Sequence, residues 1–186
     1  MSKRDRPMTR ILPDITTVKQ HQEQISQDPE LYRPKRCPRC GKSGLHYHGS
    51  YERKVPRGEG LAFLMGSLCI LRFYCPGCGG TCSRLPACLS PRRHYRWKSQ
   101  QAVLALLLAG VSIFKVSRQL LPSRHTISRW WRRLHAQYAE HTLYLCNRFP
   151  ELGRHASLAD FWSACLKQMP LANAMAWLDR DGVTVP

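Results

Sequence analysis

The sequence predicts an α+β protein in which a small β module with four cysteines is followed by three short helices and a helical C-terminal extension. Three observations predict this class. The pattern Cys-Pro-x-Cys-Gly occurs twice, at residues 37–41 and 75–79. β-rich runs lie between the two copies, and apolar residues at helical spacing dominate only after about residue 99. With 186 residues, the chain is long enough for one ordinary domain or for two or three small ones.

Each cysteine pair is spaced so that a tight turn can direct both sulfurs at one tetrahedral metal ion. Gly41 and Gly79 follow the pairs, where the turn needs a residue that tolerates a positive φ angle. Two disulfides or four ordinary buried thiols are the alternatives, but neither requires the same pattern twice. We therefore expect a zinc ribbon over residues 34–90, with Zn²⁺ bound by Cys37, Cys40, Cys75 and Cys78.

Further metal-ligand residue types lie near the two pairs. Cys82 and Cys88 are either substitute ligands or small apolar residues beneath the ribbon, and we favour the second because the first four thiols complete a tetrahedron. His46 and His48 are reserve ligands, although surface histidines on a hairpin are commoner.

The charge of the chain predicts a polyanionic partner. Lysine and arginine outnumber acidic residues 29 to 12, which gives a formal net charge of +17. Nucleic acid is the first expectation and an anionic membrane surface the second. The N-terminus lacks the apolar run of a secretory signal, and the apolar stretch 102–111 is too short to span a bilayer. Nine cysteines without such a signal indicate reduced thiols, so we expect a cytoplasmic protein without membrane contact.

The N-terminal half is expected to contain three kinds of segment. Residues 1–33 are polar and predict a flexible or loosely docked arm, with a short helix near Val18 as the alternative. Within the ribbon, Gly49-Ser50 is expected to be a hairpin turn and 68–74 a strand that leads into the second cysteine pair. Residues 91–98 form a basic, aromatic linker.

Three helices with short breaks are predicted after the linker. The first covers residues 99–109 with Ser99 as its N-cap. The second covers 113–120, and the third begins after the cap residue Ser123. Together residues 99–140 match a helix-turn-helix, the arrangement that places its last helix in the major groove of DNA.

The third helix has an apolar and a basic side. Its apolar side is expected to pack on the first two helices through Ile127, Trp131, Leu134 and Tyr138. Its other side carries the candidate DNA-binding residues Arg124, His125, Ser128, Arg129, Arg132 and Arg133. A solvated arginine face on a structural helix is the alternative, and we favour DNA contact because the face belongs to the third helix of a helix-turn-helix.

The linker is a second candidate DNA-binding segment. Its cations are expected to follow a phosphate backbone or to lie in a minor groove, and they are Arg92, Arg93, Arg96 and Lys98. In the alternative, this is a charged linker whose aromatic residues pack between ribbon and helices.

Residues 141–186 are predicted to form a helical extension. Apolar residues at helical spacing occur over 158–166 and 171–178, with Met169-Pro170 as the hinge. We expect their aromatic residues to form a core.

A family resemblance follows from several of these motifs. The two Cys-Pro-x-Cys-Gly patterns, His48-Gly49, the run 72–76 and the run 126–130 resemble the N-terminal DNA-binding half of bacterial insertion-sequence transposases, with ISL3-like transposases the nearest. The segment 81–95 is similar to a mobile-element-associated zinc-ribbon family of unknown function. This resemblance covers about residues 34–138. It implies zinc at the four cysteines and binding of element ends by the third helix.

Such transposases continue into an RNase-H-like catalytic domain with three carboxylates that hold Mg²⁺. Few residues follow the third helix here, and no strand-rich segment fixes the late carboxylates Glu151, Asp160, Asp179 and Asp181 around metal ions. We therefore expect that the chain is not an enzyme.

These observations predict a zinc-containing protein that binds double-stranded DNA. It would be transposase-like or transposition-associated, would lack its own catalytic domain, and would associate with the bacterial nucleoid. A transposase, another element-encoded protein or a second copy of the chain are further partners. Three alternatives stay open: a free-standing transcription regulator, a subunit of a strand-transfer enzyme that is active only with a partner chain, and a module that binds RNA or protein.

Overall fold

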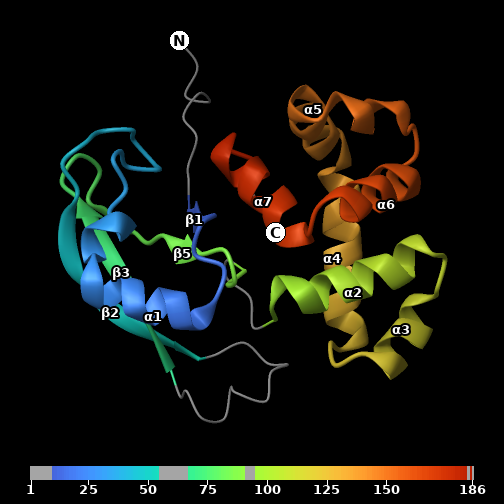
Figure 1. Ribbon diagram of the computed structural model, residues 1–186, viewed down its shortest axis with the longest axis horizontal. Coiled ribbons are helices and arrows are strands. Elements are labelled where there is room, and N and C mark those ends of the chain that lie inside the picture. The colour runs from blue at the N-terminus through green and yellow to red at the C-terminus, as the bar shows by residue number, and fades with distance from the viewer. Residues whose placement is uncertain (1–9, 55–66, 91–94, 184, 186) are drawn as a thin grey trace.

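The structure is a computed structural model, and it describes residues 10–54, 67–90, 95–183 and 185. Over these residues the fold is mixed α+β, with seven α-helices and two small sheets. Figure 1 shows the three-stranded sheet and α1 on one side and the helices α2 to α7 on the other. This arrangement agrees with the predicted α+β class. None of the described helices is long and apolar enough to cross a membrane.

The larger sheet is antiparallel, in the order β2-β3-β4. Its strands are β2 (His46–Lys54), β3 (Ser67–Cys75) and β4 (Gly80–Cys82). The prediction of a hairpin turn at Gly49-Ser50 is wrong, because these residues lie inside β2. The pairing with β3 shifts there between Tyr47 and Ser50, and Gly49 has a φ angle of 76°. The turn-like residues therefore form a β-bulge in a strand that continues to pair with the same partner.

Residues 10–33 are packed against the sheet. They form β1 (Ile11–Leu12), α1 (Val18–Gln27) and η1 (Pro29–Tyr32). The α-helix begins with a capping box, in which Thr17 accepts from the backbone N–H of Gln20 and the Gln20 side chain accepts from that of Thr17. The expected flexible arm is thus an ordered part of the fold over these residues, and residues 1–9 lie outside the described part of the chain.

A buried polar triad fastens α1 to the sheet. The Tyr32 hydroxyl lies 2.6 Å from Nδ1 of His21, and Nε2 of His21 lies 3.0 Å from the carbonyl oxygen of Cys69. Since a carbonyl can only accept, Nε2 carries the proton and Tyr32 donates to Nδ1. Burial lowers the pKa of His21, which keeps this tautomer neutral.

The helical part begins at α2 (Trp97–Leu108), followed by α3 (Ile113–Gln119) and α4 (Arg124–Ala136). The predicted caps of the second and third helices are confirmed, because Ser112 and Ser123 each accept from a backbone N–H. The first helix starts earlier than predicted, with its N-cap three residues before Ser99. Arg96 is its N-cap in place of Ser99, because Trp97 is already buried in the core as part of the helix.

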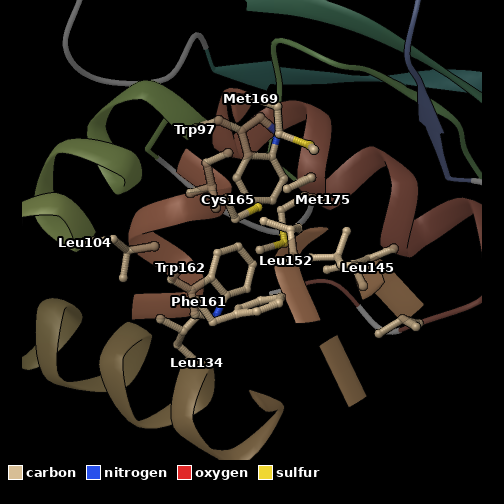
Figure 2. Packing of buried hydrophobic residues seen from close by; sticks show 14 of the residues in the cluster. Trp97, Leu104, Leu134, Leu145, Leu152, Phe161, Trp162, Cys165, Met169 and Met175 are labelled. Carbon is tan, nitrogen blue, oxygen red and sulfur yellow. The ribbon is translucent and has the colours of Figure 1, made fainter. Parts of the chain in front are cut away.

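The chain then continues with α5 (Tyr138–Arg148), η3 (Pro150–Arg154), α6 (Leu158–Gln168) and α7 (Leu171–Arg180). The two predicted C-terminal helices are confirmed as α6 and α7. In Figure 2, Trp97 and Leu104 of α2 and Leu134 of α4 lie around Phe161 and Trp162 of α6. The helices α5 to α7 therefore complete one core with α2 and α4, and the predicted extension is an integral part of the helical fold.

The segment β1 links the two parts of the molecule. It pairs in parallel with β5 (Leu85–Pro86), and the backbone N–H groups of Arg10 and Ile11 donate to Oδ2 of Asp179 in α7 at 2.5 and 2.9 Å. Ile11 belongs to the helical core, whereas Leu12 packs with the sheet. One short strand is thus buried in both cores.

Candidate functional site

The four predicted cysteines meet at one end of the sheet. The Sγ atoms of Cys37, Cys40, Cys75 and Cys78 all lie within 4.8 Å of one another. Two of the separations, Cys37 to Cys78 and Cys40 to Cys75, are 3.6 Å. A tetrahedral site with metal–sulfur bonds of about 2.3 Å places its sulfurs about 3.8 Å apart. The cluster could therefore hold a metal ion, and within the described residues no other group of three or more Cys, His, Asp or Glu side chains does so.

Two similar turns present these thiols. We call residues 37–42 the first knuckle and residues 75–80 the second. Gly41 and Gly79 have φ angles of 71° and 66°, as the pattern predicts. Their N–H groups donate to the carbonyl oxygens of Cys37 at 2.8 Å and Cys75 at 2.9 Å, respectively. The glycine after each pair therefore closes the turn that brings its two sulfurs together.

The surroundings of Cys37 favour the thiolate. Burial raises its pKa, but the backbone N–H groups of Cys40 and Arg39 and the neighbouring thiols of the cluster outweigh burial and lower the pKa to about 6. The N–H of Arg39 lies 3.4 Å from the Cys37 sulfur. A thiolate is the form that binds metals.

The remaining candidate ligands lie outside the four-thiol cluster. The thiol of Cys82 lies 3.7 Å from the carbonyl oxygen of Phe73, and burial together with the nearby Cys37 raises its pKa to about 11. Cys82 is therefore a neutral neighbour of the cluster. His48 lies on β2, where its ring packs 5.7 Å from that of Tyr74.

The basic side of α4 is exposed. On its buried side lie Ile127, Trp130 and Leu134. Trp131 also packs against the cluster of α2, α3 and α4, as expected, but it is only half-buried. Trp130 is the more buried of the two at 4% exposed, and it packs edge-on against Tyr95, with ring centroids 5.4 Å apart. Tyr138 is not part of this helix, since α4 ends at Ala136.

The predicted DNA-binding residues of α4 fall on the other side. Ser128 is half-buried, and the exposed residues are Arg124, His125, Arg129, Arg132 and Arg133. Arg129 donates to the Thr126 hydroxyl at 3.4 Å. Within the described part of the chain, none of these arginines forms an ion pair with a carboxylate. Their cationic groups are therefore available to a ligand.

The linker cations are only partly described. Arg92 and Arg93 lie outside the described residues, Arg96 is half-buried, and Lys98 is exposed. The linker aromatics pack inward, Tyr95 on Trp130 and Trp97 in the helical core.

Sequence reasoning missed two exposed cations beside α4. Lys115 and Arg118 lie on α3, which packs against α4. A simple signal could have found them: the chain has no acidic residue between Glu59 and Glu140. All basic residues in that interval therefore add to a field that no nearby carboxylate in the sequence offsets.

The comparisons with known proteins place this region in one family model. The model is described as a domain of unknown function, DUF6431, and it matches residues 37–130. The match thus runs from the first cysteine of the cluster to Trp130 in α4. No curated protein and no solved structure matches the chain.

Proposed function

This chain belongs to the DUF6431 family, and we propose that it is a zinc-containing protein that binds double-stranded DNA. In this proposal α2 to α4 form a helix-turn-helix, with α4 as the recognition helix. The observation that carries the proposal is the exposed cationic side of α4, opposite a side that is buried on α2 and α3. Such a helix can enter a major groove while its buried side stays packed on α2 and α3.

The donor set supports zinc as the metal. Four thiolates are soft ligands, and four of them within 4.8 Å of one another suit the tetrahedral coordination that Zn²⁺ prefers. A site with four protein ligands leaves no open position, so its role is structural. Zinc there would tie the first knuckle to the end of β3 and stabilise a sheet whose core is small. The donors would be Cys37, Cys40, Cys75 and Cys78.

The arrangement of α3 and α4 would let one group of residues contact bases and another contact phosphates. Residues 120–123 join the two helices, a connection of the length that helix-turn-helix motifs use. Arg129, Arg132, His125 and Ser128 would face base edges, while Arg124, Arg133 and the α3 cations would hold phosphates. Phosphate contacts supply affinity, and base contacts select the sequence.

Three carboxylates of the C-terminal part contact protein groups, which argues against a role as ligands of catalytic metal ions. Asp179 accepts from the backbone of β1, Asp181 lies 4.0 Å from Arg148, and the Ser157 hydroxyl donates to Asp160 at 2.6 Å. These contacts favour a chain that binds DNA without cutting it. On the resemblance to transposases, we propose that its sites are the ends of a mobile element in a bacterial cell.

The test is a selection of duplexes from a random pool with the zinc-loaded protein, followed by anisotropy titrations at one fixed salt concentration. Arg129→Ala with Arg132→Ala should weaken the selected site by about 2–6 kcal/mol, at about 1–3 kcal/mol per base contact. Lys19→Ala with Lys167→Ala is the matched control, because it removes two exposed cations outside α4. If both double variants bind the selected site like the wild type, α4 does not read DNA. Sites at element ends support a transposition role, and sites at promoters support a regulator.

A further inference from the structure

The first knuckle and the two residues before it carry a second group of exposed cations. No acidic residue lies between Glu30 and Glu52. The exposed basic residues in this interval are Lys35, Arg36, Arg39 and Lys42. Arg33 is also basic, but it is half-buried and forms an ion pair with Glu30 at 2.7 Å. Within the described residues, none of the four exposed cations has such a partner.

Two of these side chains lie across the second knuckle. A Cβ atom at Gly77 would be 2.5 Å from Cδ of Lys42, and one at Gly80 would be 2.8 Å from Nη1 of Arg39. Because Gly77 and Gly80 have no side chains, Lys42 and Arg39 can occupy the space next to them. Both side chains are exposed, so their charges lie at the surface beside the four-thiol cluster.

Charge balance at the metal site does not account for all four cations. Four thiolates and one divalent ion carry a net negative charge, and Arg39 and Lys42 are the cations that lie over the knuckle holding two of these thiols. Lys35 and Arg36 add further positive charge in the chain just before Cys37. The surface is thus positive even with a bound metal, and its complement is a polyanion.

We infer that Lys35, Arg36, Arg39 and Lys42 form a second surface that binds the phosphates of DNA. This inference rests on the proposed function and adds a separate contact to it. In Figure 1 the knuckle end of the sheet lies at the upper left and the turn between α3 and α4 at the lower right. The two surfaces therefore contact different stretches of DNA. The knuckle surface contributes affinity and salt dependence, whereas α4 contributes sequence selection.

The experiment measures binding to the selected duplex over a series of salt concentrations. Each lost phosphate contact makes the slope of log K against log salt shallower by about 0.9, so Arg39→Ala with Lys42→Ala should reduce the slope by about 1.8. The sequence preference should stay that of the wild type. The charge-conserving pair Arg39→Lys with Lys42→Arg should keep the wild-type slope, and the Lys19→Ala with Lys167→Ala control should change it less.

All variants are compared with one zinc bound per chain. If Arg39→Ala with Lys42→Ala does not hold zinc, Lys35→Ala with Arg36→Ala replaces it with the same expected slope. A wild-type slope in the zinc-loaded knuckle variant, together with tight binding by the wild type, would overturn this inference and leave the proposed function intact. Failure of the wild-type protein to bind any duplex would instead overturn the proposed function itself.

Discussion

Removal of the metal is expected to unfold the sheet part of the protein and to leave the helical part folded. The sheet part has two small clusters of buried apolar residues, in which Leu71 and Phe73 pack with the N-terminal segment and Leu68 and Ile70 with the segment after β4. The helical part has a larger core, formed mainly by α2 and α4 to α7, to which β1 adds only Ile11 and the segment after β5 only Ala87. The two parts therefore differ in how much they depend on the cysteine cluster.

The expected loss of stability of the sheet part is set by the free energy of zinc binding. Structural zinc contributes about 10–16 kcal/mol to a small domain at neutral pH. Whole small domains are stable by only about 5–15 kcal/mol, so the loss of zinc exceeds what the sheet part can sustain. Trp162, Phe161 and Leu134 are buried in the helical core and should stay buried when the metal is removed.

The tryptophans make this difference measurable. All five lie in the helical part, at positions 97, 130, 131, 162 and 177. On addition of a zinc chelator, amide exchange of β2 and β3 should become fast, while tryptophan emission should stay that of buried indoles. Elemental analysis should find one zinc per chain before chelation.

Two cysteine variants provide the matched control. Cys75→Ser removes a ligand and should reproduce the chelated state, whereas Cys82→Ser changes a neighbouring thiol outside the cluster and should retain zinc. If the chain binds no zinc, or if amides of β3 stay protected after chelation, the sheet part does not depend on a metal for its stability.

Two further predictions concern buried polar groups. Burial raises the pKa of Asp179 from its ordinary value of 3.8 to about 6, against the opposing N–H groups of Ile11 and Arg10 and the charges of Arg10 and Arg84. Because the folded-state pKa is the higher one, the wild type should lose up to about 3 kcal/mol relative to Asp179→Asn as pH rises from 4 to 7. Denaturant unfolding at both pH values measures this difference. If the wild type gained stability relative to Asp179→Asn as the pH rises, the N–H donors would outweigh burial. Tyr32→Phe should cost about 1–3 kcal/mol by leaving a buried acceptor unsatisfied, and an unchanged melting midpoint would contradict the hydrogen bond assigned to His21.

Local sequence signals were sufficient for the ends of several elements. Ser112 and Ser123 cap α3 and α4 as predicted, because a cap depends on residues within one turn of the chain. The N-cap of α2 was predicted three residues late, at Ser99 in place of Arg96, because burial of Trp97 extends the helix. In β2, Gly49 suggested a turn, and pairing with β3 turned it into a bulge.

The order of residues 10–33 could not be predicted in the same way. This segment has few apolar residues, and its spacing offered a short helix near Val18 only as the alternative to a polar arm; that helix is α1. Its stability comes from partners far along the chain. Ile15 shares an apolar cluster with Leu71. The carbonyl oxygen of Arg10 accepts from the N–H of Leu85, and the N–H of Ile11 donates to Asp179. Composition alone does not show such contacts.

The identity of the clustered thiols can be predicted from local sequence, because each Cys-Pro-x-Cys-Gly pattern builds its own turn and its glycine needs no distant partner. The sequence also determined the basic side of α4, since helical geometry alone places Arg129 and Arg132 together. Three other features are visible only in the folded molecule: Trp130 is buried and Trp131 half-buried, α5 to α7 complete the core of α2 and α4, and β1 joins the two parts. The physical reason is that these outcomes depend on packing between segments far apart in the chain, which local spacing does not specify.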